Sequence, residues 1–152
     1  MNRPTVLIVS TGDSCRSQMA AGFLRQVAGD RLDVFTAGMQ PSGELQPLAV
    51  KIMAEVAIDI SAQKPTAVSE YLGKRDFDYL VTVTTEAEGQ IPQSQPGVGQ
   101  RLHWSFDNPA TAEGAEFEKL RMFRCVRNEI AFQVKKWVYG DLIKVIASMQ
   151  PS

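Results

Sequence analysis

Residues 5–17 read Thr-Val-Leu-Ile-Val-Ser-Thr-Gly-Asp-Ser-Cys-Arg-Ser, and this stretch decides the fold. Its first half, residues 5–10, is a short β-branched apolar run, typical of a central strand that is buried on both faces. A glycine follows at once, and apolar residues then recur at helical spacing, at Met19, Ala20, Phe23, Leu24 and Val27. A buried strand that leads through a tight turn into a helix predicts an α/β domain.

The rest of the chain continues the alternation of strands and helices. We expect strands at residues 33–37, 79–84 and 101–104, loops at 40–46 and 88–99, and a helix that begins at Pro47. A long helix is expected from about residue 112 to 139, with a buried stripe of Leu120, Phe123, Val126, Ile130, Val134 and Trp137. Gly140 is expected to end this helix, and residues 140–152 are interpreted as a C-terminal helical extension, with a further turn or two at 142–147. The pattern has no internal repeat, so residues 1–152 are expected to form one domain.

Composition and charge exclude several classes of function. The chain of 152 residues has a net charge of −1, with 44% hydrophobic and 22% charged residues, as in an ordinary globular protein. The sequence has no basic stripe of the kind that indicates nucleic-acid binding. It also has no apolar run long enough to span a membrane. Two cysteines in a chain with an adequate core favour a reducing compartment, so a cytoplasmic location is expected. No metal or cofactor is expected.

The loop after the first strand combines several features that bind anions. Gly12 allows a tight turn, in which successive N–H groups can converge on one point. The start of the helix adds its unpaired N–H groups, and Arg16 can offer a planar fork to two oxygens. We therefore expect this loop to bind phosphate, arsenate or sulfate, through Thr11, Gly12, Asp13, Ser14, Cys15, Arg16 and Ser17. A plain strand-to-helix turn with an exposed arginine is the alternative, because short motifs have many false matches.

Residues 6–20, Val-Leu-Ile-Val-Ser-Thr-Gly-Asp-Ser-Cys-Arg-Ser-Gln-Met-Ala, resemble the signature of the low-molecular-weight protein tyrosine phosphatases. They are most similar to the thioredoxin-coupled arsenate reductase branch of that family. The resemblance extends over about residues 5–138, with further similar stretches at 36–38, 55–61, 78–83, 103–110 and 123–130. It implies a single three-layer α/β domain with a central four-stranded parallel sheet in the order 2-1-3-4. Helices would cover both faces, and the phosphatase-type anion loop would follow the first strand.

The positions that carry catalysis in this family depart from its pattern. Its nucleophile is a cysteine of low pKa, and Ser10 stands at that position here, where an alcohol is far harder to ionise. Its general acid is an aspartate before a proline, and the residue before Pro109 is Asn108, an amide with no proton to give. Asp107 lies one residue earlier and could replace it only if the backbone of this loop shifted.

The two cysteines that the reductase branch uses for its redox chemistry are also missing from this sequence. By the resemblance, its two further cysteines fall at about Thr84 and Ile91, neither of which can do thiol chemistry, so coupling to thioredoxin is not expected. Asp13 stands where asparagine is usual, and Ala21 where glutamate is usual. A carboxylate at position 13 should weaken anion affinity unless it is turned away or paired.

The remaining reactive side chains have simpler interpretations. The pKa of Cys15 could be depressed by its neighbour Arg16, but we favour a small buried apolar role for it. We expect Cys125 to lie in the core, His103 to be structural and Trp104 and Trp137 to be packing residues.

Three hypotheses follow for function. The first is a family member that binds an oxyanion or a phosphorylated protein or peptide, with weakened or lost catalysis, a pseudoenzyme. The second is an active tyrosine phosphatase that forms a cysteinyl-phosphate and whose nucleophilic cysteine was replaced by the serine at position 10. The third is an interaction module whose loop binds nothing and whose partner surface is the tail, residues 137–146.

Overall fold

Four parallel strands form the centre of the molecule in the computed structural model, which describes residues 3–142, 144 and 147. The strands are β1 (Thr5–Ser10), β2 (Asp33–Gly38), β3 (Phe77–Thr82) and β4 (Val98–His103). Their order in the sheet is β2-β1-β3-β4, and every pairing is parallel. The predicted fold class and strand order are thereby confirmed.

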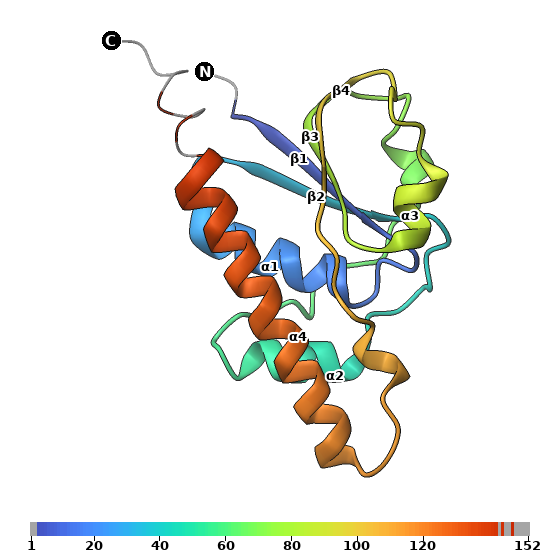
Figure 1. The fold of residues 1–152 in the computed structure, drawn as a ribbon, viewed down its shortest axis with the longest axis vertical. Helices are drawn as coiled ribbons and strands as arrows, with labels where there is room; N and C mark the ends of the chain where they lie inside the picture. Colours follow the sequence, from blue (N-terminus) through green and yellow to red (C-terminus); the bar gives the residue numbers. More distant parts are fainter. Residues whose placement is uncertain (1–2, 143, 145–146, 148–152) are drawn as a thin grey trace.

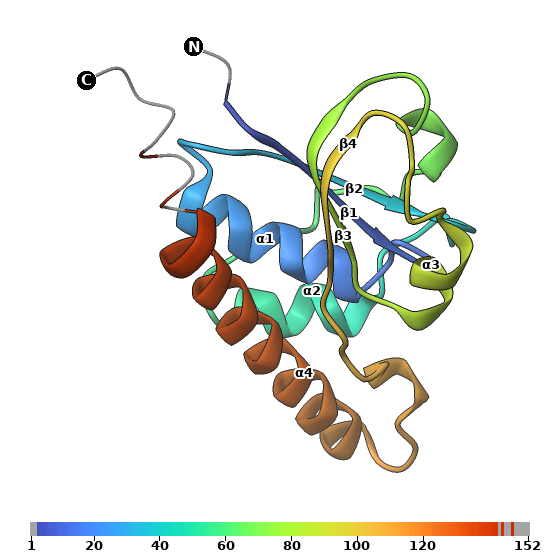
Figure 2. The ribbon, with the colours of Figure 1, turned by 45° about the horizontal axis from the view of Figure 1, so that its top comes forward.

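Helices cover the two faces of the sheet unequally (Figures 1 and 2). Helices α1 (Arg16–Ala28), α2 (Pro47–Ala54) and α4 (Glu116–Trp137) lie on one face, and the short α3 (Thr85–Gln90) lies on the other. β1 therefore has core on both sides. Its Val6 and Ile8 side chains pack with the three-helix layer, and Leu7 and Val9 pack in the smaller cluster beneath α3. This two-sided burial explains the continuous apolar run in β1.

Helix α4 buries the predicted stripe, in which all six side chains are at most 8% exposed. Near its C-terminal end, the Trp137 ring meets Tyr79 and Trp104 edge to face, which confirms the packing role of both tryptophans. The prediction for Cys125 is wrong, because this cysteine is exposed. It lies one position before the buried Val126 and therefore off the three-to-four-residue spacing of the stripe.

Several element boundaries differ from those that the patterns predict. β3 begins and ends two residues earlier than expected, and Thr84 instead begins α3 by accepting a hydrogen bond from the Ala87 N–H at 3.2 Å. The predicted loop at 88–99 thus loses its first residues to α3 and its last to β4. β4 starts three residues earlier than expected. It is an edge strand with mostly exposed or half-buried side chains, so it lacks a strong apolar signal.

The C-terminal helix begins later than predicted. Gly114 has a φ of +106° and Ala115 is extended, so α4 starts only at Glu116. Gly140 does not end the helical backbone, which continues as a π-helical turn, η3 (Val138–Leu142). The predicted turns at 142–147 lie largely outside the described residues. Within the described part of the chain, no helix is both long and apolar enough to cross a membrane.

Candidate anion-binding site

The loop between β1 and α1 lines a pocket of about 220 Å³ at the carboxyl edge of the sheet. Parallel sheets bind ligands at this edge. Residues from three segments line the pocket: the loop itself, the residue before α2 and the short turn η2 (Pro109–Thr111) with its preceding residue. The lining residues are Ser10, Thr11, Gly12, Asp13, Ser14, Cys15, Arg16, Gln46, Asn108 and Ala110. Sequence reasoning did not name Gln46 and Ala110 as site residues: Gln46 belongs to no motif, and Ala110 ends the 103–110 stretch, in which only Asp107 and Asn108 were named.

The loop backbone is held from outside by the segment that follows β2. The carbonyl groups of Ser10, Thr11, Gly12 and Ser14 accept N–H groups of residues 39, 40, 42 and 46 at 2.8–3.0 Å. By contrast, the N–H groups of Gly12 and Ser14 donate no hydrogen bond to any of the described residues. The four carbonyl groups are thus hydrogen-bonded to the segment after β2, while the two N–H groups remain available to a ligand. This polarity is that of an anion nest.

Gly38, the last residue of β2, allows the loop to lie this close to the sheet. A Cβ atom at this position would come within 3.0 Å of Asp13 Cβ, Asp13 N and the Gly12 carbonyl carbon. Contacts of this length are tighter than nine in ten real Cβ contacts, and two of these atoms belong to the backbone, which cannot swing aside like a flexible side chain. The Thr36-Ala37-Gly38 stretch therefore has a direct role in shaping the loop.

The hydroxyl of Ser10 occupies the centre of a hydrogen-bond network beneath the loop. Ser10 is only 4% exposed, and its Oγ accepts the Asp13 N–H at 2.9 Å. It also lies 2.8 Å from Ser17 Oγ, at the start of α1. Ser17 Oγ in turn donates to Asp13 Oδ1 at 2.7 Å. The side chain at the nucleophile position is thus connected to a carboxylate through one other hydroxyl.

The Asp13 carboxyl is directed into the protein interior. The residue is 0% exposed and adopts a φ of +52°. Its Oδ2 accepts Thr36 Oγ1 at 3.0 Å and the Thr66 N–H at 2.9 Å. Burial raises the pKa of this carboxyl to about 6, against the opposing effect of its hydrogen bonds with Ser17, Thr66 and Thr36. Asp13 therefore meets the condition set from the sequence, being both turned away and hydrogen-bonded. Its partner Thr66 contributes only a backbone N–H, which no sequence pattern reveals.

The guanidinium group of Arg16 is half-buried and joins the loop to the segment after β4. Its Nη1 donates to the Phe106 carbonyl oxygen at 3.0 Å. Burial lowers the pKa of Arg16, while the charges of Glu86 and Asp107 act in the opposite direction. An arginine nevertheless stays cationic in proteins at neutral pH. A guanidinium has five N–H donors, so the bond to Phe106 leaves others for a ligand.

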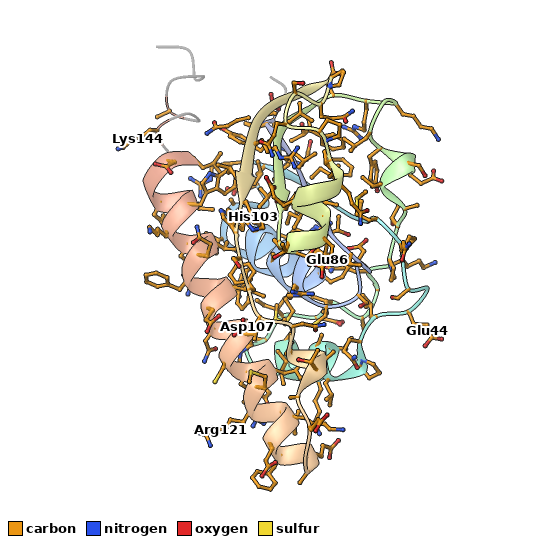
Figure 3. The ribbon with its side chains drawn as sticks, turned by 45° about the vertical axis from the view of Figure 1, so that its right-hand side comes forward. Glu44, Glu86, His103, Asp107, Arg121 and Lys144 are labelled. Carbon is orange, nitrogen blue, oxygen red and sulfur yellow. The ribbon has the colours of Figure 1, made fainter. Side chains whose placement is uncertain are left out.

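The residues at the expected acid position differ in their relation to the pocket. Asn108 lines it, but its side-chain oxygen accepts the Ala110 N–H at 3.1 Å and so caps the turn η2. Asp107 is exposed and is not among the lining residues. Figure 3 shows it on the segment that leads from β4 toward α4. Neither residue therefore presents an acid to the pocket in this structure.

The sulfur and imidazole groups do not extend the site. Cys15 lines the pocket but is only 7% exposed, which confirms its buried position, and burial raises the pKa of its thiol to about 12. His103 Nδ1 lies 2.8 Å from Thr82 Oγ1 at the end of β4, outside the pocket. Thr84 Oγ1 accepts Thr11 Oγ1 at 3.2 Å, and Ile91 is buried beneath α3. Among the described residues, no group of three or more potential ligands could hold a metal ion.

Comparison with known proteins gives a consistent assignment. A family model for the low molecular weight phosphotyrosine protein phosphatases matches residues 5–146. An arsenate reductase from Halalkalibacterium halodurans is 42% identical over 135 residues, which cover 89% of this chain and 95% of that protein. An arsenate reductase from Bacillus subtilis is 42% identical over 138 residues, 90% of this chain and 96% of that protein.

Solved structures agree with these sequence relatives. An arsenate reductase in its phosphate-binding state superimposes with a TM-score of 0.71 at 25% identity, over 97% of this chain and 99% of that one. An arginine phosphatase from Geobacillus stearothermophilus gives a TM-score of 0.77 at 17% identity, over 98% and 99% of the two chains. The latter likeness concerns the fold alone.

Proposed function

Because the chain belongs to the low molecular weight phosphotyrosine protein phosphatase family, we propose that it binds a tetrahedral oxyanion in the loop from Ser10 to Ser17, with weakened or lost catalytic turnover. The ligand is phosphate, arsenate or sulfate, or the phosphoryl group of a modified protein or peptide. We place this activity in the cytoplasm, and nucleic acid, membrane and thioredoxin have no part in it.

The polarity of the loop carries this proposal. Carbonyl oxygens are the groups that repel an anion, and four of them are engaged by the segment of residues 39–46. The N–H groups of Gly12 and Ser14, the start of α1 and the Arg16 side chain remain as donors. The likeness to an arsenate reductase in its phosphate-binding state supports the same ligand class.

Weakened catalysis follows from the groups that the pocket lacks. The alcohol at position 10 is a poorer nucleophile than a thiolate, and Asn108 cannot protonate a leaving group. Thr84 and Ile91 exclude a disulfide relay at the two positions where the reductase branch carries cysteines.

Titration of the purified protein with phosphate, arsenate and sulfate tests the proposal. We expect saturable binding by calorimetry, with amide shifts of Gly12 and Ser14 in NMR spectra. The Arg16→Ala variant should weaken binding at least about tenfold, because a charge-assisted hydrogen bond contributes about 1.5–3 kcal/mol. Arg121→Ala, which removes an exposed arginine of α4, is the matched control. Absence of binding, or equal affinity of wild type and Arg16→Ala, would contradict the proposal and favour a module whose loop binds nothing.

A further inference from the structure

The hydrogen bonds that join Ser10, Ser17 and Asp13 have a defined direction. A hydroxyl has one proton, and Ser17 gives its proton to Asp13 Oδ1 at 2.7 Å. Ser17 can therefore only accept in its 2.8 Å contact with Ser10, so Ser10 is the donor. Two protons thus lie along one path, from Ser10 Oγ to Ser17 Oγ and from Ser17 Oγ to the carboxylate.

The end of this path is a group that can take up a proton. Asp13 has no ion-pair partner among the described residues. Its three donors are neutral, and Arg25 of α1 is the cation whose field reaches it. Burial raises the pKa of Asp13 to about 6, so the carboxyl is ionised at neutral pH but a better base than an ordinary aspartate. General bases in active sites are commonly carboxylates of this kind, whose pKa is raised by burial and only partly lowered again by hydrogen bonds.

The beginning of the path faces the pocket. Ser10 Oγ donates to Ser17 and accepts the Asp13 N–H at 2.9 Å, which leaves one lone pair of its oxygen unused among the described residues. The same N–H would stabilise negative charge that develops on Ser10 Oγ as its proton leaves. Ser10 also lines the pocket in which the proposed oxyanion binds.

We propose that Ser10 is a nucleophile toward phosphoryl donors and that Ser17 and Asp13 accept its proton in relay. This inference rests on the proposed oxyanion binding. In the step, a bond forms between Ser10 Oγ and phosphorus, and the bond between phosphorus and the leaving oxygen breaks. The Ser10 proton moves to Ser17, and the Ser17 proton moves to Asp13, which becomes neutral. The leaving group departs with the electron pair of the broken bond.

The absence of an acid at Asn108 defines the class of donor. The leaving oxygen receives no proton, so only donors whose leaving group is stable as an anion react, such as aryl phosphates with electron-withdrawing substituents. Once Ser10 is phosphorylated, its oxygen has no proton to give, and the relay no longer serves an attacking water. The phosphoserine form of the protein therefore accumulates instead of turning over.

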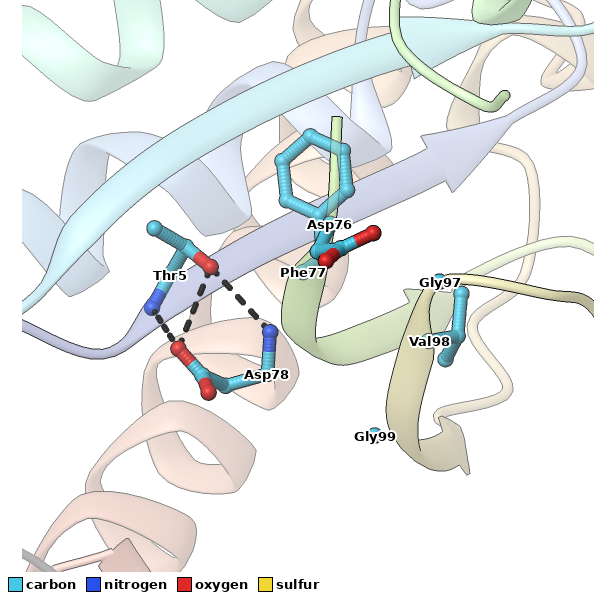
Figure 4. Close-up of a pocket in the computed structure, with 7 residues that line it drawn as sticks. All are labelled: Thr5, Asp76, Phe77, Asp78, Gly97, Val98 and Gly99. Atoms are coloured by element: carbon cyan, nitrogen blue, oxygen red, sulfur yellow. Dashed lines mark hydrogen bonds between the residues drawn. The ribbon is translucent and has the colours of Figure 1, made fainter. Parts of the chain in front are cut away.

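The test uses the purified chain of 152 residues and dinitrophenyl phosphate. We expect one equivalent of dinitrophenolate to be released in a single phase, an intact mass increased by one phosphoryl group, and the modification at Ser10 by peptide mapping. Ser10→Ala should abolish the adduct. Asp13→Asn and Ser17→Ala should slow its formation at least about tenfold, in the lower range of general acid–base effects. Asp78→Asn is the matched control, because its carboxylate also accepts a backbone N–H and a hydroxyl, from Thr5, at the opposite edge of the sheet (Figure 4).

A pH profile separates a proton acceptor from a merely structural aspartate. The wild-type rate should rise with pH as Asp13 ionises and then level off, while the residual rate of Asp13→Asn should not show this rise. Phosphate binding is measured on every variant by calorimetry. Binding without an adduct, or an adduct that forms equally fast in Asp13→Asn, would overturn the relay and leave the proposed function intact. If the wild-type protein does not bind phosphate, the proposed function itself is overturned.

Discussion

Replacing Asp13 by asparagine should stabilise the protein at neutral pH, although it removes a residue at the centre of the loop network. Burial raises the pKa of Asp13 from 3.8 to about 6 in the folded protein. Between these pH values the folded state holds a proton that the unfolded chain has released. By linkage, the free energy of unfolding therefore falls as pH rises through this window. Above the window, the ionised carboxylate of Asp13 makes the folded protein less stable.

The size of this effect follows from the shift. A difference of about two pKa units corresponds to about 3 kcal/mol at 1.36 kcal/mol per unit, and full burial of Asp13 leaves little solvent screening to reduce it. Asparagine cannot ionise, so the variant does not incur this cost. Its amide can accept from Thr36 and the Thr66 N–H through oxygen and donate to Ser17 through nitrogen, which keeps the network satisfied.

Urea denaturation of the wild type and Asp13→Asn across pH 4 to 8 measures the prediction. The difference in unfolding free energy should shift by about 2.4 kcal/mol in favour of the variant between pH 4 and pH 8, because the unfolded carboxyl is still partly protonated at pH 4. Most of this change should fall below pH 6. A constant difference across the range would refute the reasoning, because it would mean that Asp13 titrates alike in both states.

Three further outcomes are expected. Ser10→Cys should react with iodoacetamide slowly at neutral pH, and the Ser10→Cys/Asp13→Asn double variant should react at least about tenfold faster, because removing a nearby negative charge lowers a thiol pKa. Gly38→Ala should destabilise the protein by about 1–3 kcal/mol in urea denaturation, since its Cβ would meet backbone at 3.0 Å, and should weaken phosphate binding in parallel; an unchanged midpoint would contradict this. Maleimide should label the native protein once, at the exposed Cys125, and the denatured protein twice, with Cys15 as the second site; two labels on the native protein would contradict the burial of Cys15.

The parts of the fold that the sequence predicts well are those with two-sided burial or clear helical spacing. β1 is apolar at every position from Val6 to Val9, so its strand character and its central place could be inferred. The stripe along α4 identified its buried face for the same reason. β4 lies at the edge of the sheet and reads Val-Gly-Gln-Arg-Leu-His, so burial left little trace in its composition. α3 has only six residues and buries only Ala87, which is too short a segment for a periodic signal.

The candidate site shows a similar division. The loop and its arginine form a continuous motif, so their place after β1 could be inferred, and the proposed ligand class rests on the same motif. The orientation of Asp13 could not be inferred, because it depends on a positive φ, on the Thr66 N–H and on Thr36 of the neighbouring strand β2. A carboxylate beside an anion loop is unfavourable when it faces the ligand, and the three-dimensional structure alone shows that it faces the core.

The direction of hydrogen bonding connects the residues at positions 10 and 13. An ionised carboxylate at 13 only accepts, so Ser17 must donate to it and must accept from whatever stands at 10. Serine fits this arrangement because it keeps its proton until the relay removes it. A thiolate at 10 has no proton to donate and would place two negative charges around one hydroxyl, whereas an amide at 13 would donate to Ser17 and let Ser17 donate to a thiolate. Ser10 and Asp13 are therefore mutually consistent, and each is a poor partner for the residue that the family usually has at the other position.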